Sequence, residues 1–159
     1  MTGLREQGGQ VQAPAEASGI YRKILVGLDG SEASNTALRA AIRLARAHGA
    51  SLHALGVEEH LPRYPATVGE VEEAKEEQDR FFSRVVEDAR QIAREYETDL
   101  TTEVRMGNAP HQIVSVARDG GFDLIVLGAK GHNIIRDFLL GTTTDRVSHH
   151  APCSVLIVR

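Results

Sequence analysis

The sequence of 159 residues lacks several features that would place it in other environments. Cys153 is the only cysteine, which excludes an intramolecular disulfide and suits a reducing cytosol. No apolar run reaches the ~18 residues expected of a membrane-spanning helix, so we expect no membrane partner. The formal net charge of −4 comes from acidic and basic residues scattered along the chain, which argues against a nucleic-acid partner. These absences predict a cytoplasmic protein.

Residues 1–19 differ in composition from the rest of the chain. They are rich in Gly, Gln, Ala and Glu and contain no apolar signal core, so we expect a disordered tail. Residues 20–159 are numerous enough to bury a hydrophobic core without disulfides or metal ions. We therefore expect one folded domain after the tail.

Short apolar runs alternate with longer segments of helical periodicity, which is typical of a parallel sheet wrapped by helices. This alternation predicts an α/β fold. The predicted strands span residues 23–28, 51–57, 99–105, 122–127 and 153–159. The predicted helices lie near residues 33–45, 68–97, 113–117 and 142–149.

The helix predicted at residues 68–97 is the longest, and it carries apolar side chains at helical spacing. We expect these side chains to face the sheet: Val71, Ala74, Phe81, Val85, Ala89, Ile92 and Tyr96. The opposite positions are charged, which predicts a solvated outer face.

A segment of glycines and threonines follows the fourth predicted strand. Its members are Gly128, Gly131, Gly141, Thr142, Thr143 and Thr144, with nine residues between the second and third glycines. Glycine lets the backbone approach a ligand closely, and N–H groups and hydroxyls donate hydrogen bonds to an anion. The threonines also open a predicted helix, whose dipole favours phosphate. This pattern predicts a phosphate site, although a helix cap at Thr142 would account for the hydroxyl alone.

Two runs of the sequence resemble the universal stress protein family, in its nucleotide-binding branch. They are DGSE at residues 29–32 and GAKGHNIIRDFLLGTTTDRVSHHAPCSVLIV at residues 128–158. The resemblance covers about residues 21–159. It implies a doubly wound five-stranded sheet of order 3-2-1-4-5 with helices on both faces, and ATP bound where strands one and four end. Open α/β sheets bind ligands where the strand order reverses, so an independent rule gives the same position.

The resemblance also implies which residues contact the nucleotide. On the nucleoside side these are Gly27, Leu28 and Asp29, with the backbone of Val57 binding the base. The ribose and inner phosphates would contact Leu127, Gly128, Lys130 and Gly131. The outer phosphates would contact Gly141, Thr142, Thr143 and Thr144.

Asp29 has two interpretations. Together with Ser31 it caps the first helix, or it takes part in nucleotide binding. A carboxylate repels a bare triphosphate, so in the second case a cation or a ribose hydroxyl lies between them. Mg²⁺ is therefore implied as a cofactor with Asp29 as its ligand.

The last predicted strand is apolar and lies at the edge of the implied sheet. An unpaired apolar edge promotes aggregation unless something covers it. Pairing of two copies across a two-fold axis covers it, and the family resemblance implies the same homodimer.

The preferred hypothesis is an ATP-binding regulator or switch of the cytosolic stress response, with slow or no ATP turnover. The sequence has no GxxxxGK[ST] loop and no identifiable residue that would activate water against the γ-phosphate. One alternative is an ATPase or phosphoryl-transfer enzyme. A further alternative is an interaction module that binds AMP, cAMP or no nucleotide.

Overall fold

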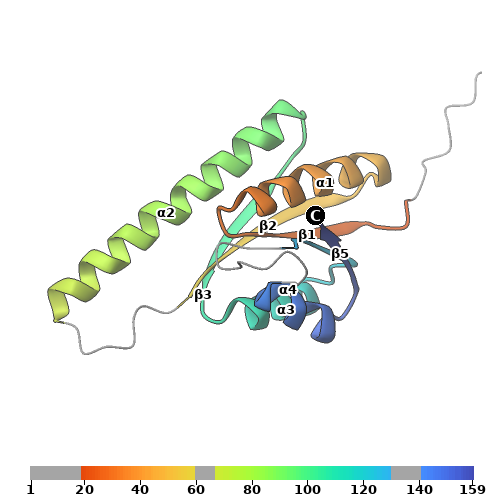
Figure 1. The fold of residues 1–159 in the computed structure, drawn as a ribbon. Coiled ribbons are helices and arrows are strands. Elements are labelled where there is room, and N and C mark those ends of the chain that lie inside the picture. Colours follow the sequence, from red (N-terminus) through yellow and green to blue (C-terminus); the bar gives the residue numbers. More distant parts are fainter. Residues whose placement is uncertain (1–18, 60–66, 130–140) are drawn as a thin grey trace, which may run out of the picture.

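The computed structural model describes residues 19–59, 67–129 and 141–159, which form a parallel sheet with helices on both faces (Figure 1). The strands are β1 (Lys23–Leu28), β2 (Ser51–Glu58), β3 (Thr101–Met106), β4 (Leu124–Gly128) and β5 (Ser154–Val158). The helices are α1 (Glu32–His48), α2 (Val68–Glu95), α3 (Ala109–Asp119) and α4 (Thr142–His150). The strand order β3-β2-β1-β4-β5 confirms the predicted fold class. The predicted tail, except Gly19, lies outside the described residues.

The central strands are buried on both faces because helices cover both. Ile24, Leu25 and Val26 are consecutive residues of β1, and each has no exposed surface. The side chains of Ile24 and Val26 join a core with α1 and α2, whereas Leu25 joins a second core with α3 and α4. A continuous apolar run is therefore required here, as expected for parallel strands between helical layers.

Helix α1 has clear signals at both ends. The Oγ of Ser31 accepts a hydrogen bond from the Ser34 N–H at 3.1 Å, which caps its start. Gly49 ends the helix with a left-handed φ of 64°, which glycine adopts without strain. Ala37 and Ala41 are fully buried, and their small side chains let the helix pack closely on the sheet.

The inward stripe predicted for α2 is wrong in its first half. Val71 is 44% exposed, and the buried residues of the helix begin only at Phe82. The 28 residues of α2 span about 42 Å, whereas the eight residues of β2 span about 26 Å. The helix is therefore longer than the strands on which it packs. Figure 1 shows the N-terminal end of α2 extending past the strands. A capping box between Thr67 and Glu70 starts the helix there without support from packing.

Several predicted boundaries differ by one to three residues. Helix α2 ends at Glu95 rather than at residue 97, because Glu97 adopts a positive φ of 49° that leaves the helix. Strand β3 begins at Thr101, and β4 spans Leu124–Gly128 rather than residues 122–127.

The buried carboxyl of Glu58 makes stability depend on pH. Its side chain lies at the end of β2 and is only 7% exposed. Burial raises its pKa, nearby Asp79 raises it further, and Lys75 opposes the shift. Because the folded-state pKa is raised, the contribution of the Glu58 carboxyl to stability is fully present at acidic pH, below its pKa in the unfolded chain. That contribution is lost as pH rises through the folded pKa.

We therefore expect Glu58→Gln to increase the free energy of unfolding at about pH 7 and to change it little at about pH 4, where the carboxyl is largely protonated. Urea denaturation at both pH values measures this difference. Glu72→Gln, on the exposed face of α2, is the matched control and should show no such dependence. An equal effect of Glu58→Gln at both pH values would contradict the explanation.

Candidate functional site

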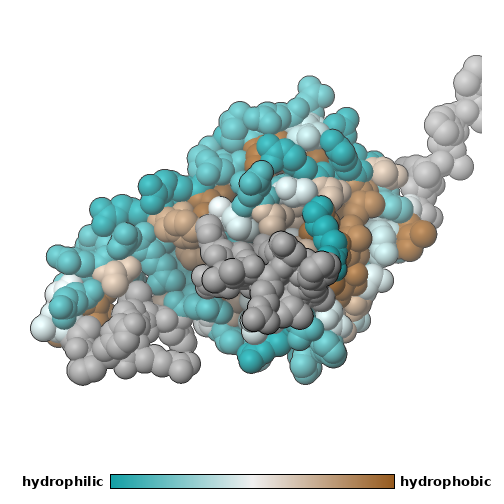
Figure 2. Space-filling model, in the orientation of Figure 1, coloured by the Kyte–Doolittle hydropathy of each residue, from teal (hydrophilic) through white to brown (hydrophobic). Residues whose placement is uncertain are grey.

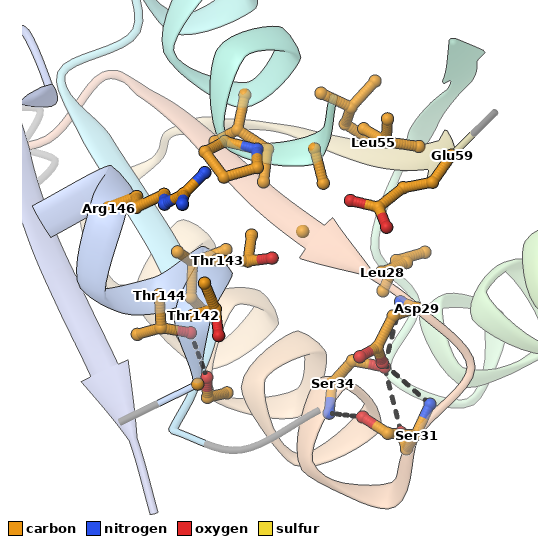
Figure 3. Close-up of a pocket in the computed structure, with 18 of the residues that line it drawn as sticks. Leu28, Asp29, Ser31, Ser34, Leu55, Glu59, Thr142, Thr143, Thr144 and Arg146 are labelled. Carbon is orange, nitrogen blue, oxygen red and sulfur yellow. Dashed lines mark hydrogen bonds between the residues drawn. The ribbon is translucent and has the colours of Figure 1, made fainter. Parts of the chain in front are cut away.

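A cavity of about 500 Å³ lies at the carboxyl ends of β1, β2 and β4, where the strand order reverses (Figure 3). The structure brings ten of the twelve predicted site residues into its lining: Gly27, Leu28, Asp29, Val57, Leu127, Gly128, Gly141, Thr142, Thr143 and Thr144. Lys130 and Gly131 lie outside the described residues.

Asp29 supports the turn between β1 and α1. Its Oδ1 accepts a hydrogen bond from the Ser31 N–H at 2.9 Å, and Ser31 in turn caps the helix. Gly30 stands between them with a positive φ of 78°, which such a turn requires. Among the described residues, the second carboxylate oxygen of Asp29 has no hydrogen-bond partner. The capping role thus belongs to Ser31, and Asp29, which lines the cavity, retains one oxygen without a partner among the described residues.

Gly128 lies where β4 approaches the first turn of α1. A Cβ at this position would lie 2.8 Å from the carbonyl carbon and oxygen of Ala33, too close for any side chain without a backbone shift. The glycine is therefore required for packing, independently of any ligand. The same close approach brings the starts of α1 and α4 to the two sides of β4.

Thr144 differs from the two threonines before it. Its side chain is 5% exposed, and its Oγ1 donates a hydrogen bond to the Gly128 carbonyl at 2.9 Å. This bond ties the first turn of α4 to the end of β4. The hydroxyl proton of Thr144 is consequently engaged within the protein, which leaves its backbone N–H as the donor toward the cavity. Thr142 is exposed and Thr143 is half-buried.

Helix α4 begins at the cavity without a side-chain cap. Gly141 occupies the N-cap position, so the predicted alternative of a cap at Thr142 is wrong. The first intrahelical bond runs from the Asp145 N–H to the Gly141 carbonyl at 2.8 Å. The N–H groups of Thr142, Thr143 and Thr144 precede it and have no carbonyl one turn earlier in the helix. This arrangement favours an anion.

Comparison with known proteins identifies the family. A model of the Universal stress protein family matches residues 20–159. The chain belongs to the universal stress protein family. Universal stress protein YxiE of Bacillus subtilis is 32% identical over 148 residues, which cover 88% of this chain and all of that protein.

Two solved structures of universal stress proteins share this fold. UspA from Lactobacillus plantarum superimposes with a TM-score of 0.77 at 33% identity, covering 87% of this chain and 98% of that chain. A universal stress protein in complex with cAMP superimposes with a TM-score of 0.69 at 25% identity, covering 87% and 97% of the two chains. The likeness confirms the fold class predicted for this member of the family.

The cavity of this universal stress protein is also lined by residues that no sequence motif indicated. The residues not predicted are Ser31, Ser34, Leu55, Glu59, Phe82, Asn108, Ala109, Pro110, Ile113 and Arg146. Asn108 caps α3, its Oδ1 accepting from the His111 N–H at 3.2 Å, so the α3 start meets the cavity as well. Parallel strands present all their carboxyl ends at one edge, and this rule would have brought the turn after β3 to the site.

Few side chains of the described residues of this universal stress protein could hold a metal ion. Within residues 19–59, 67–129 and 141–159, no group of three or more His, Cys, Asp or Glu side chains is arranged to hold a metal ion. Mg²⁺ commonly binds one or two carboxylates together with substrate phosphates, and keeps several waters. The single available oxygen of Asp29 fits that mode of binding.

No helix in the described part of the chain combines the length and apolar character needed to cross a bilayer.

Burial raises the pKa of the Cys153 thiol, and the nearby Asp123 adds to the shift. Since the thiolate is the reactive form, this side chain behaves as a small apolar residue.

Proposed function

We propose that this protein binds ATP in the cavity at the carboxyl ends of β1 and β4 and acts as a cytosolic regulator or switch of the stress response. One observation carries the proposal. Predicted nucleotide-binding residues from four separate segments of the chain line one cavity, which lies where the strand order of the sheet reverses. The relative crystallised with cAMP supports an adenine nucleotide as the ligand.

The cavity has complementary regions for the parts of a nucleotide. Leu55, Val57 and Ile113 provide an apolar surface for the base, and the start of α4 provides N–H donors for phosphate. Asp29 lies on the β1 side, where its available oxygen accepts from a ribose hydroxyl or binds Mg²⁺. A volume of about 500 Å³ lies within the ordinary range for small-molecule sites.

Bound Mg²⁺ would offset the negative charge of the phosphates next to Asp29.

Turnover of ATP is expected to be slow or absent. The described lining has two carboxylates, Asp29 and Glu59, and both belong to the β1 and β2 side rather than to α4. Neither is therefore assigned as a base for water attack at the outer phosphate.

A second candidate ligand is cAMP or AMP, and the cAMP complex of the relative favours it. Native mass spectrometry of protein purified without added nucleotide, followed by competition with ATP, ADP, AMP and cAMP, separates the candidates. We expect a retained adenine nucleotide that ATP displaces in the presence of Mg²⁺. Displacement by cAMP or AMP but not by ATP would assign the site to the second candidate. No binding of any of the four would remove the proposed function.

We also propose a homodimer paired through β5. This strand is hydrogen-bonded to β4 on one side and forms an edge of the sheet. Leu156 is 37% exposed, and Figure 2 shows apolar side chains at the position of β5 in Figure 1. Pairing with a second copy would cover this edge.

The register of β5 identifies a substitution that tests the dimer. The Val158 carbonyl accepts from the Ala129 N–H at 2.8 Å, so the N–H and carbonyl of Ile157 point away from β4. Ile157→Pro removes an outward N–H without removing a bond to β4. We expect light scattering to show a dimer for the wild type and for Ile157→Val, and a monomer for Ile157→Pro. A wild-type monomer, or an unchanged dimer in Ile157→Pro, would exclude pairing through this edge.

A further inference from the structure

The cavity has walls of opposite charge. The carboxylates of Asp29 and Glu59 belong to the ends of β1 and β2, whereas Arg146 of α4 is the only cation among the described lining residues. Figure 3 shows Glu59 and Arg146 on opposite sides of the cavity. An anionic ligand is therefore attracted toward one wall and repelled by the other.

Arg146 is an exposed residue in the second turn of α4, and Figure 3 shows its side chain extending toward the cavity. It lies four residues after Thr142 and three after Thr143, so the three share one face of the helix. Helical side chains lean toward the N-terminus of their helix, so a guanidinium at this position is within reach of a ligand at the first turn. No described residue forms a salt bridge with Arg146, so its charge is available to a ligand.

Glu59 is fixed by its backbone and points its side chain into the cavity. Its carbonyl accepts a hydrogen bond from Nε2 of Gln78 on α2 at 3.0 Å. The carboxylate extends toward the cavity in Figure 3, and no described residue forms a salt bridge with it. Its charge therefore acts on whatever occupies the cavity.

We propose that Arg146 and Glu59 select ligands by phosphate charge: Arg146 binds a phosphate group, and Glu59 repels the added charge of a triphosphate that lacks a divalent cation. The inference rests on the proposed function, because it concerns the same cavity. A guanidinium suits this role because its planar set of donors matches phosphate oxygens. The cavity would then accept a monophosphate without metal and accept ATP chiefly with Mg²⁺.

Isothermal titration of adenosine, AMP and ATP, in EDTA and again in Mg²⁺, tests the proposal on the full chain. Arg146→Gln should weaken binding of ATP in Mg²⁺ by about tenfold and change adenosine binding by less than about twofold, because adenosine has no phosphate to reach the start of α4. Glu59→Gln should tighten ATP binding in EDTA by about three- to tenfold and have a smaller effect in Mg²⁺. The two substitutions thus change affinity in opposite directions.

Two matched controls remove the same charges from surfaces away from the cavity. Arg43→Gln on α1 and Glu95→Gln at the end of α2 are both exposed positions and should leave every affinity unchanged. Arg146→Lys keeps the charge but not the planar donors, and should restore part of the ATP affinity. Thermal unfolding of each variant checks that the fold is retained.

The outcomes distinguish this inference from the proposed function. Wild-type protein that binds ATP in Mg²⁺ no better than adenosine, or Arg146→Gln that weakens adenosine and ATP equally, would overturn the role of Arg146. Unchanged or weaker ATP binding by Glu59→Gln in EDTA would overturn the role of Glu59. In these cases a measured wild-type affinity leaves the nucleotide site standing. A wild type that binds none of the three ligands overturns both.

Discussion

Thr142→Asp is expected to abolish nucleotide binding while leaving the protein as stable as the wild type or slightly more so. Thr142 is exposed in the first turn of α4, at the cavity. A carboxylate there interacts favourably with the helix dipole, by about 0.3–1 kcal/mol. The same carboxylate would lie next to the proposed outer phosphates, where repulsion lowers affinity by about 100-fold or more. Titration calorimetry and thermal unfolding measure the two effects separately.

The matched control for this prediction is Thr142→Asn, which has nearly the same shape as the aspartate without its charge. It should keep affinity within about fivefold of the wild type. Equal losses in both variants would mean that shape rather than charge is recognised at the start of α4. Unchanged ATP affinity in Thr142→Asp would show that no phosphate lies there.

Gly128→Ala should destabilise the protein by about 2 kcal/mol and weaken nucleotide binding, because the added Cβ has no room. It would lie 2.8 Å from backbone atoms of Ala33, which are held by α1. Separating α1 from β4 also disturbs the Gly128 carbonyl that accepts from Thr144, and with it the position of α4. Urea denaturation gives the loss of stability, and calorimetry gives the loss of affinity.

Gly69→Ala is the same substitution at another position, and we expect it to change the stability of the protein in the opposite direction. Gly69 lies in α2, where a Cβ would meet nothing within 4 Å. Alanine favours a helix over glycine, so this variant should gain about 0.5–1 kcal/mol and bind nucleotide normally. If the two alanine variants were equally stable, the close approach at Gly128 would not constrain the fold.

The sheet could be predicted because its sequence signals are local. The continuous apolar run at β1 already indicates burial on both faces, and Ile24, Leu25 and Val26 divide between the two cores as such a strand requires. Ends of elements were less certain because they depend on single backbone conformations, such as the positive φ of Glu97.

The part of α2 beyond the sheet could not be predicted, since helical periodicity defines a face but not what lies opposite it. Val71 continues the apolar spacing of the helix, yet none of the five described strands extends far enough to cover it. The prediction would have needed the relative lengths of the helix and of β2.

The residues of the candidate site that belong to a sequence motif could be predicted. The residues that reach the site only through the fold could not. Glycines and threonines form a recognisable spacing, whereas Glu59 and Arg146 are charged residues of ordinary appearance in the sequence. They lie at the cavity because the chain brings the end of β2 and the second turn of α4 to the same edge. The hydrogen bond from Thr144 to Gly128 was likewise hidden, since it joins residues 16 positions apart.

A crystal structure of the protein grown with ATP and Mg²⁺ would show directly whether this cavity holds the nucleotide. We expect nucleotide density in the cavity, with the base against Val57, the phosphates at the N–H groups that begin α4, and Mg²⁺ near Asp29. A cavity filled by the protein's own side chains, or a nucleotide bound elsewhere on the molecule, would contradict it.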